Sequence, residues 1–256
     1  MRLNKPNQDF SQYLSALAGG ARAGVRRPVV AFFDLDRTLI DRYSLTAFAW
    51  QTIREGKMTP ERFVRLGLMF LCYGLGRIDY DEMLRATVKD IQGMPEAELQ
   101  KLSQDTYDLQ LAECLYLEGV ALVQQHQALG HEIVMVTSAT SYQAEPVAEV
   151  LGMNHVLSTK LEIIDGNVSG GAEPCFGSGK LAAASTYVES AGARITDAYF
   201  YTDSHDDLPL LEQVGNPVIV NGKAQLKKIG RRRGWIQLEF QHTGRVEPVC
   251  LPRRTV

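Results

Sequence analysis

Two short apolar runs that end in polar side chains constrain the fold of this chain most. Residues 28–34 read Pro-Val-Val-Ala-Phe-Phe-Asp, and residues 131–137 read His-Glu-Ile-Val-Met-Val-Thr. Continuous apolar runs of this length are typical of strands that are buried on both faces, as in a parallel sheet. Helical patterns at 118–129, 143–151 and 179–191 alternate with these runs and with a third at 198–202. The alternation predicts an α/β fold with a mostly parallel sheet covered by helices on both faces.

The remaining core elements follow from turn residues and short apolar runs. Residues 155–158 predict a short strand, and Asp165-Gly166 within 161–169 predicts a hairpin, because Asp-Gly favours tight turns. A helix is expected over 206–214 and a last strand over 217–220. The last helix is expected over 223–229.

Residues 45–117 do not share the alternation of strands and helices, because they show helical periodicity and no convincing strand. Thr59-Pro60 and Met94-Pro95 are typical helix starts. We therefore predict an all-helical insertion after the first core strand. The core is assigned to 29–44 and 118–230. Residues 1–28 are expected to form an N-terminal extension with a short helix at 9–17 and an Ala/Gly/Arg-rich stretch at 18–27, and 231–256 a basic C-terminal tail.

Composition excludes several classes of protein. The chain has 256 residues, 45% of them hydrophobic, and a net charge of −3, which is ordinary for a globular domain and gives no bias toward nucleic acid. The four cysteines are scattered without a C-x-x-C pair, so we expect no zinc site, and scattered thiols suit the reducing cytoplasm. Residues 1–10 lack an apolar signal segment, and the most apolar segment, 63–75, is too short for stable membrane insertion.

Polar side chains gather where the predicted core strands end. Ligands of open α/β sheets bind beyond the carboxyl ends of the strands. Crowded carboxylates repel one another, and a hard divalent cation relieves that repulsion. Oxygen ligands without His or Cys favour Mg²⁺, with Mn²⁺ as an alternative, and a nearby lysine then favours a phosphoryl substrate. The candidate residues are Asp34, Asp36, Thr137, Ser138, Lys180, Asp203, Asp206 and Asp207.

These residues resemble, in order and spacing, the four motifs of the haloacid dehalogenase-like (HAD) hydrolase superfamily. The motifs are Asp34-x-Asp36-x-Thr38, Thr137, Lys180 and Asp203-x-x-x-Asp207. The helical insertion resembles the C1 cap of that superfamily, which sits on a Rossmann-like core. The segments at 32–39 and 174–180 are similar to subfamily IB, which includes phosphoserine phosphatases.

The resemblance implies a role for each residue. Asp34 would be the nucleophile that forms an aspartyl-phosphate, and Asp36 the general acid and base. Mg²⁺ would lie between Asp34, the backbone carbonyl of Asp36, and Asp203. Thr137 and the Ser138 amide would bind the phosphoryl group, whose charge Lys180 would neutralise. Asp207 would hold Lys180 or metal-bound water, with Asp206, at a position where phosphoserine phosphatases commonly carry Asn, beside it.

The resemblance also leaves alternatives open. Phosphoserine phosphatases carry Glu where this chain has Tyr43, and Ser-Gly-Gly where it has Thr137-Ser138-Ala139. These departures argue against assigning phosphoserine alone. The expected substrate is a small phosphorylated metabolite, with phosphoserine and histidinol phosphate as candidates. The alternatives are a phosphotransferase or mutase, a phospholipid-headgroup phosphatase, and a non-catalytic binding protein. The lipid alternative would use the apolar stretch 63–73 together with the basic tail. If the protein does not bind lipid, we expect that stretch to form the core of the cap. The oligomeric state stays open.

Overall fold

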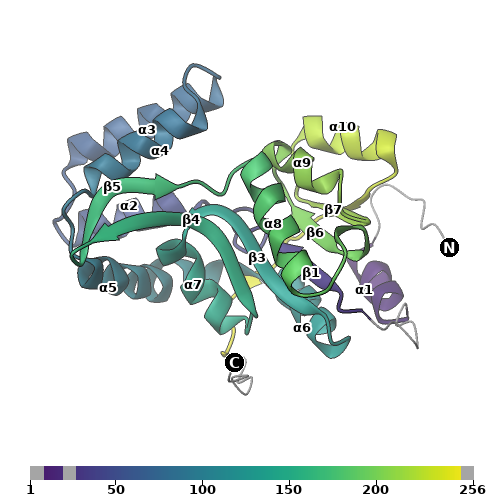
Figure 1. Cartoon of the computed structure of the whole chain (residues 1–256). Coiled ribbons are helices and arrows are strands. Elements are labelled where there is room, and N and C mark those ends of the chain that lie inside the picture. Colours follow the sequence, from purple (N-terminus) through teal and green to yellow (C-terminus); the bar gives the residue numbers. More distant parts are fainter. Residues whose placement is uncertain (1–8, 20–26, 249–256) are drawn as a thin grey trace.

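A seven-stranded sheet organises the computed structural model, which describes residues 9–19 and 27–248 (Figure 1). The strand order is β5-β4-β3-β1-β6-β7-β8, and all neighbours are parallel except β4 and β5. The central strand β1 pairs with β3 and β6, so that Phe33 lies level with Met135 and Tyr201. The predicted α/β fold is therefore confirmed. The strands are β1 (Val30–Phe33), β3 (Glu132–Thr140), β4 (His155–Ile164), β5 (Asn167–Glu173), β6 (Tyr199–Thr202), β7 (Asn216–Val220) and β8 (Ile236–Leu238).

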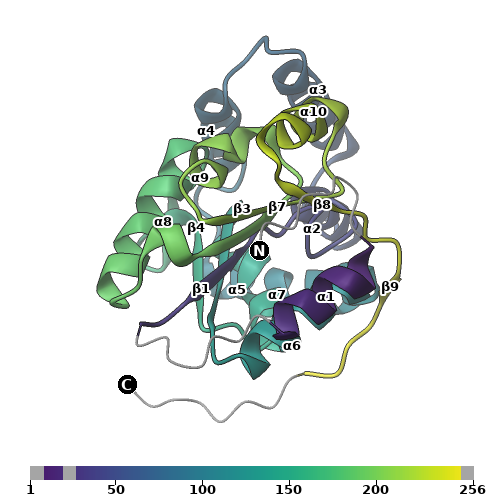
Figure 2. The ribbon, with the colours of Figure 1, turned by 90° about the vertical axis from the view of Figure 1, so that its right-hand side faces the viewer.

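Helices cover both faces of the sheet (Figure 2). Alternate residues of β1 point to opposite sides: Ala31 and Phe33 belong to one apolar cluster, whereas Val30 and Phe32 belong to another. The first cluster includes α1 (Phe10–Gly19), α6 (Leu117–Ala128) and α7 (Ser141–Val150). The second includes α8 (Ser178–Ser190), α9 (Leu208–Leu211) and α10 (Ala224–Arg233).

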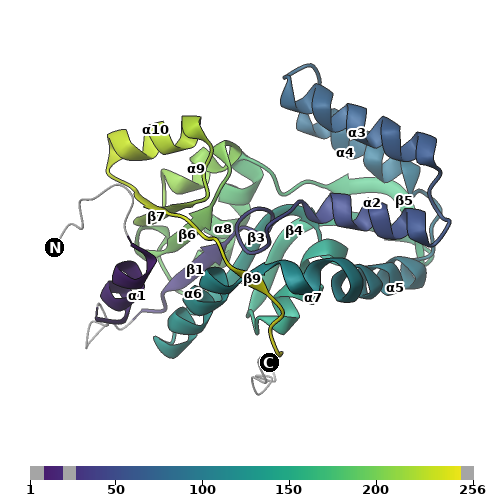
Figure 3. The ribbon, with the colours of Figure 1, turned by 180° about the vertical axis from the view of Figure 1, so that it is seen from behind.

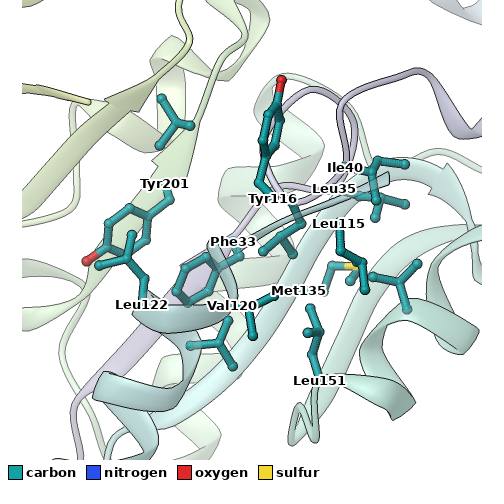
Figure 4. Packing of buried hydrophobic residues seen from close by; sticks show 14 of the residues in the cluster. Phe33, Leu35, Ile40, Leu115, Tyr116, Val120, Leu122, Met135, Leu151 and Tyr201 are labelled. Atoms are coloured by element: carbon teal, nitrogen blue, oxygen red, sulfur yellow. The ribbon is translucent and has the colours of Figure 1, made fainter. Parts of the chain in front are cut away.

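Aromatic packing joins the N-terminal helix α1 to the core. The rings of Phe33 and Tyr201 stack with centroids 4.6 Å apart, among Leu122 and Met135 (Figure 4). The buried Tyr201 hydroxyl is hydrogen-bonded to the Tyr13 hydroxyl of α1 and to His126 Nε2 of α6, each at 2.8 Å. The predicted helix of the N-terminal extension is thus present and packs against the core. Most of the predicted Ala/Gly/Arg-rich stretch, residues 20–26, lies outside the described residues.

Four helices are inserted between β1 and α6, consistent with the expected C1 cap (Figure 3). They are α2 (Ser44–Arg54), α3 (Pro60–Gly74), α4 (Tyr80–Asp90) and α5 (Glu96–Thr106). The Thr59 side chain caps α3, as its sequence predicts, and Asp79 caps α4. Phe48, Val88 and Leu102 form a small cluster with Val168 of the β4–β5 hairpin. After α5, a π-helical turn (Tyr107–Leu111) and a 3₁₀ turn (Ala112–Cys114) lead to β2 (Leu115–Tyr116), which pairs with β9 (Thr243–Gly244).

Three expectations about local structure were wrong. The strand at 217–220 is not the last, because β8 adds a parallel strand beside β7. The sequence of β8 was not recognised as a strand because it follows the basic run at 231–233, which was assigned to a tail. That run forms the last turn of α10, where positive charges are favourable at the C-terminus of a helix. The helix expected at 206–214 is a 3₁₀ turn (His205–Asp207) followed by the short α9. The apolar stretch at 63–73 was expected to form the core of the cap, but Leu66 is its only buried residue.

The described part of the chain contains no helix that is long and apolar enough to span a membrane.

Candidate active site

A buried lysine between two aspartates forms the centre of the candidate site. Asp34 directly follows β1, and its backbone N–H donates to the Tyr201 carbonyl at 2.9 Å, which fixes it at the carboxyl end of the sheet. Lys180 Nζ donates to Asp34 Oδ1 at 2.9 Å and to Asp207 Oδ2 at 3.0 Å. All three side chains are buried. The ion pairs therefore join three segments that are distant in sequence.

The start of α8 places Lys180 in this position. Gly177 precedes the helix with φ +53°, a conformation that favours glycine, and Lys180 lies in the first turn. A lysine is unfavourable at the positive end of a helix dipole unless anions offset it. Burial alone would lower the pKa of Lys180, but the charges of Asp207 and Asp34 outweigh burial and raise that pKa. The ammonium is therefore charged at neutral pH.

Two threonines hold the two aspartates of the last motif, one through a carboxylate and the other through a backbone N–H. Thr202 Oγ1, at the end of β6, donates to Asp207 Oδ2 at 2.6 Å. The buried Thr38 Oγ1 accepts from the backbone N–H of Asp203 at 3.1 Å. Thr38 thereby ties the turn after β1 to the turn after β6. Sequence reasoning assigned no role to either threonine, although Thr38 is part of the first motif.

Asp36 connects the turn after β1 to the cap. Its Oδ1 accepts from the backbone N–H of Ser44, the first residue of α2, at 2.8 Å. The turn after it bends sharply, with Arg37 at φ +60°. That conformation is uncommon for a residue with a side chain and is typical of functional turns. Asp36 is thus held where the cap leaves the core.

The buried carboxylates outnumber the cations around them. Burial raises the pKa of Asp34 to about 7, with Lys180 opposing the rise. Burial, together with the charges of Asp34 and Asp207, raises the pKa of Asp203 to about 8. Burial raises the pKa of Asp36 to about 6. A divalent cation would offset this repulsion, and a donor set made only of oxygens suits Mg²⁺.

The ligands expected for the metal ion include two carboxylate side chains and one backbone carbonyl. No three His, Cys, Asp or Glu side chains are grouped closely enough to hold a metal ion within residues 9–19 and 27–248. The implied ligand set does not require such a group, since it combines the carboxylates of Asp34 and Asp203 with the backbone carbonyl of Asp36. The residues present therefore fit a magnesium site of mixed side-chain and backbone oxygens. The metal-ligand roles stay predictions.

The second motif lies on the neighbouring strand β3. Because Phe33 pairs with Met135, Thr137 lies within one step of Asp34 along the sheet. Thr137 is buried, and its Oγ1 accepts from the Ala139 N–H at 3.1 Å, which leaves its hydroxyl hydrogen free to donate. The Ser138 carbonyl accepts from the Tyr80 hydroxyl of α4 and from Thr159 Oγ1, both at 2.9 Å. The predicted phosphate-binding roles of Thr137 and Ser138 are compatible with this arrangement and stay predictions.

Asp206 turns toward the cap. It is exposed, and its Oδ2 accepts from the Tyr73 hydroxyl of α3 at 3.1 Å, whereas Asp207 is the carboxylate that contacts Lys180. Tyr73 and Tyr80 also contact Phe176, which precedes Lys180 in the chain. These cap contacts were missed by sequence reasoning. Nothing in the local pattern marks a tyrosine that meets a residue 58 or 133 positions away.

A model of the haloacid dehalogenase-like hydrolase family matches residues 31–212. The chain belongs to this family. The match covers the strand ends that carry the candidate site and the helical insertion. The predicted membership of the HAD superfamily is therefore confirmed.

Relatives within this HAD family include phosphatases. A histidinol-phosphatase of Neisseria meningitidis is 29% identical over 83% of this chain and 99% of its own length. A phosphoserine phosphatase, SerB1, of Mycobacterium tuberculosis is 27% identical over 95% of this chain and 81% of its own. A structure from Bordetella pertussis, described as a protein of unknown function, has a TM-score of 0.78 and 27% identity, and covers 83% of this chain and 98% of that chain. At the level of the family, the prediction of a HAD-type phosphatase is confirmed.

Proposed function

We propose that this HAD protein is a Mg²⁺-dependent phosphomonoesterase that acts on a small phosphorylated metabolite through an aspartyl-phosphate. The observation that carries the proposal is Lys180 held between Asp34 and Asp207 at the carboxyl end of the central strand. A buried ammonium beside a carboxylate nucleophile offsets negative charge where a phosphoryl group would enter. The two relatives, a histidinol-phosphatase and a phosphoserine phosphatase, support the same class of reaction.

The chemistry divides between the two aspartates of the first motif. Asp34 Oδ1 is engaged by Lys180, which leaves Oδ2 to attack phosphorus. As the ester P–O bond breaks, Asp36 donates a proton to the departing alkoxide. Asp36 then takes a proton from water, which attacks the aspartyl-phosphate, releases inorganic phosphate and restores the Asp34 carboxylate.

Magnesium would be held by Asp34, the backbone carbonyl of Asp36, and Asp203, and would supply charge stabilisation to the phosphoryl oxygens. Its binding has a readout besides activity. Because the ion relieves repulsion among buried carboxylates, MgCl₂ should raise the melting temperature of the protein. Asp203→Asn should lose most of this rise, whereas Asp105→Asn, on the exposed face of α5, should keep it. An equal rise in both variants would contradict the assigned ligands.

The substrate is tested by phosphate release from a panel of phosphate esters. The panel contains phosphoserine, histidinol phosphate and p-nitrophenyl phosphate, each with Mg²⁺ and with EDTA, and Asp34→Asn serves as the blank. We expect EDTA-sensitive release that is lost in the blank, with one metabolite turned over well above the others. Turnover by Asp34→Asn would contradict the mechanism. Transfer of phosphate to added alcohols in preference to water would indicate a phosphotransferase.

A second candidate, a phosphatase of phospholipid headgroups, is favoured by the outer face of α3. Val64, Leu68 and Leu71 are exposed by 57–59%, on the opposite side of the helix from the buried Leu66. The test is co-sedimentation with vesicles of phosphatidylserine and phosphatidylcholine. Sedimentation that Leu68→Glu abolishes would support this candidate, and absence of sedimentation would eliminate it.

A further inference from the structure

Tyr80, at the start of α4, is the cap tyrosine that contacts the second motif of the candidate site. The Tyr80 hydroxyl donates to the Ser138 carbonyl at 2.9 Å, and its ring stacks on Phe176 with centroids 4.0 Å apart and an interplanar angle of 4°. Ser138 follows Thr137 in the second motif, and Phe176 lies in the loop that leads to Lys180. Tyr80 therefore contacts the two loops that are expected to bind the phosphoryl group.

The contact with Tyr80 completes the hydrogen bonding of the peptide group that joins Ser138 to Ala139. The Ser138 carbonyl accepts from two hydroxyls, those of Tyr80 and the buried Thr159, and so uses both of its lone pairs. The N–H of the same peptide group, that of Ala139, donates to Thr137 Oγ1 at 3.1 Å. Both ends of this peptide group are therefore fixed, one end by the cap and the other by Thr137.

Thr159 extends the same connection to the third motif. Its hydroxyl oxygen accepts from the backbone N–H of Cys175 at 3.1 Å while its hydrogen serves the Ser138 carbonyl. The Tyr80 hydroxyl lies 3.3 Å from the same oxygen. Burial raises the pKa of Tyr80, so its hydroxyl remains a donor at neutral pH.

We propose that Tyr80 is a positioning residue that couples the seating of the cap to the orientation of the Thr137 hydroxyl. This proposal rests on the proposed function of the site. When α4 is seated, Tyr80 fixes the Ser138–Ala139 peptide group. The Ala139 N–H then occupies the acceptor side of Thr137, and the Thr137 hydroxyl hydrogen points to where a phosphoryl oxygen would bind. When α4 moves away, the peptide group loses one of its two carbonyl donors.

The first test is a double-mutant cycle with p-nitrophenyl phosphate. Tyr80→Phe keeps the ring against Phe176 and removes only the hydroxyl, and we expect kcat to fall about two- to tenfold with little change in KM, the range for one hydrogen bond. In a Thr137→Ala background the same change should have no further effect, because Tyr80 acts through Thr137. An equal fall in both backgrounds would overturn the proposal.

The matched control is Tyr142→Phe. Tyr142 of α7 also joins the core to the cap, through a 2.8 Å hydrogen bond to Glu96 of α5, but it does not contact the second motif. We expect its kcat to match that of the wild type. A fall equal to that of Tyr80→Phe would show a general effect of cap attachment and would overturn the proposal.

A measurement that needs no turnover separates this proposal from the proposed function. Amide hydrogen exchange of Ala139 should be about two- to tenfold faster in Tyr80→Phe than in the wild type, and unchanged in Tyr142→Phe. Unchanged exchange in Tyr80→Phe would overturn the proposed coupling. If the wild-type protein released no phosphate from any ester, the proposed function would fail, and the exchange result would still decide whether Tyr80 fixes this peptide group.

Discussion

Replacing Lys180 with methionine should affect both stability and turnover. Methionine keeps most of the length of the lysine side chain but removes its charge, which leaves Asp34 and Asp207 buried without the donor that lies 2.9–3.0 Å from each. Removing one partner of a buried ion pair typically costs about 3–5 kcal/mol. Loss of a group that stabilises charge in a reaction typically lowers kcat about 10²–10³-fold.

The loss of stability should depend on pH. The ammonium lowers the pKa of Asp34, which burial has raised to about 7, so its removal raises that pKa further. When the Asp34 carboxyl of the variant is protonated at the lower pH, it no longer carries a buried charge that lacks a cation. Lys180→Met should therefore be destabilised more at pH 8 than at pH 6.

Urea unfolding at both pH values measures the loss of stability, and phosphate release from p-nitrophenyl phosphate measures the loss of turnover. Lys101→Met is the matched control, since Lys101 forms only an exposed i,i+4 ion pair with Asp105. It should alter neither quantity measurably. Wild-type stability and turnover in Lys180→Met at pH 8 would refute the assignment of Lys180 to the centre of the site.

Three further predictions concern the supporting structure. Burial, together with the neighbouring His131, lowers the pKa of His126 from 6.5 to about 3, so the unfolded chain binds an extra proton between these values. The free energy of unfolding should fall as pH drops from 6.5, and His126→Gln should reduce that slope by up to about 1.4 kcal/mol per pH unit; equal slopes in urea titrations would contradict this. Thr202→Val, which removes the 2.6 Å donor to Asp207, should cost about 1–3 kcal/mol in urea unfolding, and no loss would argue against this hydrogen bond. Leu122→Ala, in the packed core, should cost about 2–5 kcal/mol, and a loss below this range would mean that the core rearranges to fill the space.

The sheet and the motif positions were predictable because their signals are local. Strands that are buried on both faces are continuous apolar runs, and in a parallel sheet the residues that follow them meet at one edge. That reasoning placed Asp34 and Lys180 at the same edge of the sheet, where the structure pairs them. The Asp165-Gly166 turn was likewise predictable, because both residues adopt positive φ in the hairpin.

Features that depend on distant contacts were not predictable. The strand β8 has only three residues, and its place beside β7 is decided by tertiary pairing. The apolar residues of α3 predicted burial, but their periodicity does not say which face of the helix packs against the rest of the cap. The contact of Tyr80 with Ser138 depends on how the cap is seated, which no local pattern encodes.

The most direct test of the account is detection of phosphate on Asp34. Asp36→Asn should still be phosphorylated by p-nitrophenyl phosphate, whose leaving group departs without protonation, but should hydrolyse the aspartyl-phosphate slowly. Mass spectrometry of the quenched variant should show one added phosphoryl group on the peptide that contains Asp34, absent when Asp34→Asn is added to the same variant. Steady turnover by the wild type, with no phosphorylated protein in Asp36→Asn or with the phosphate on another residue, would contradict the proposed mechanism.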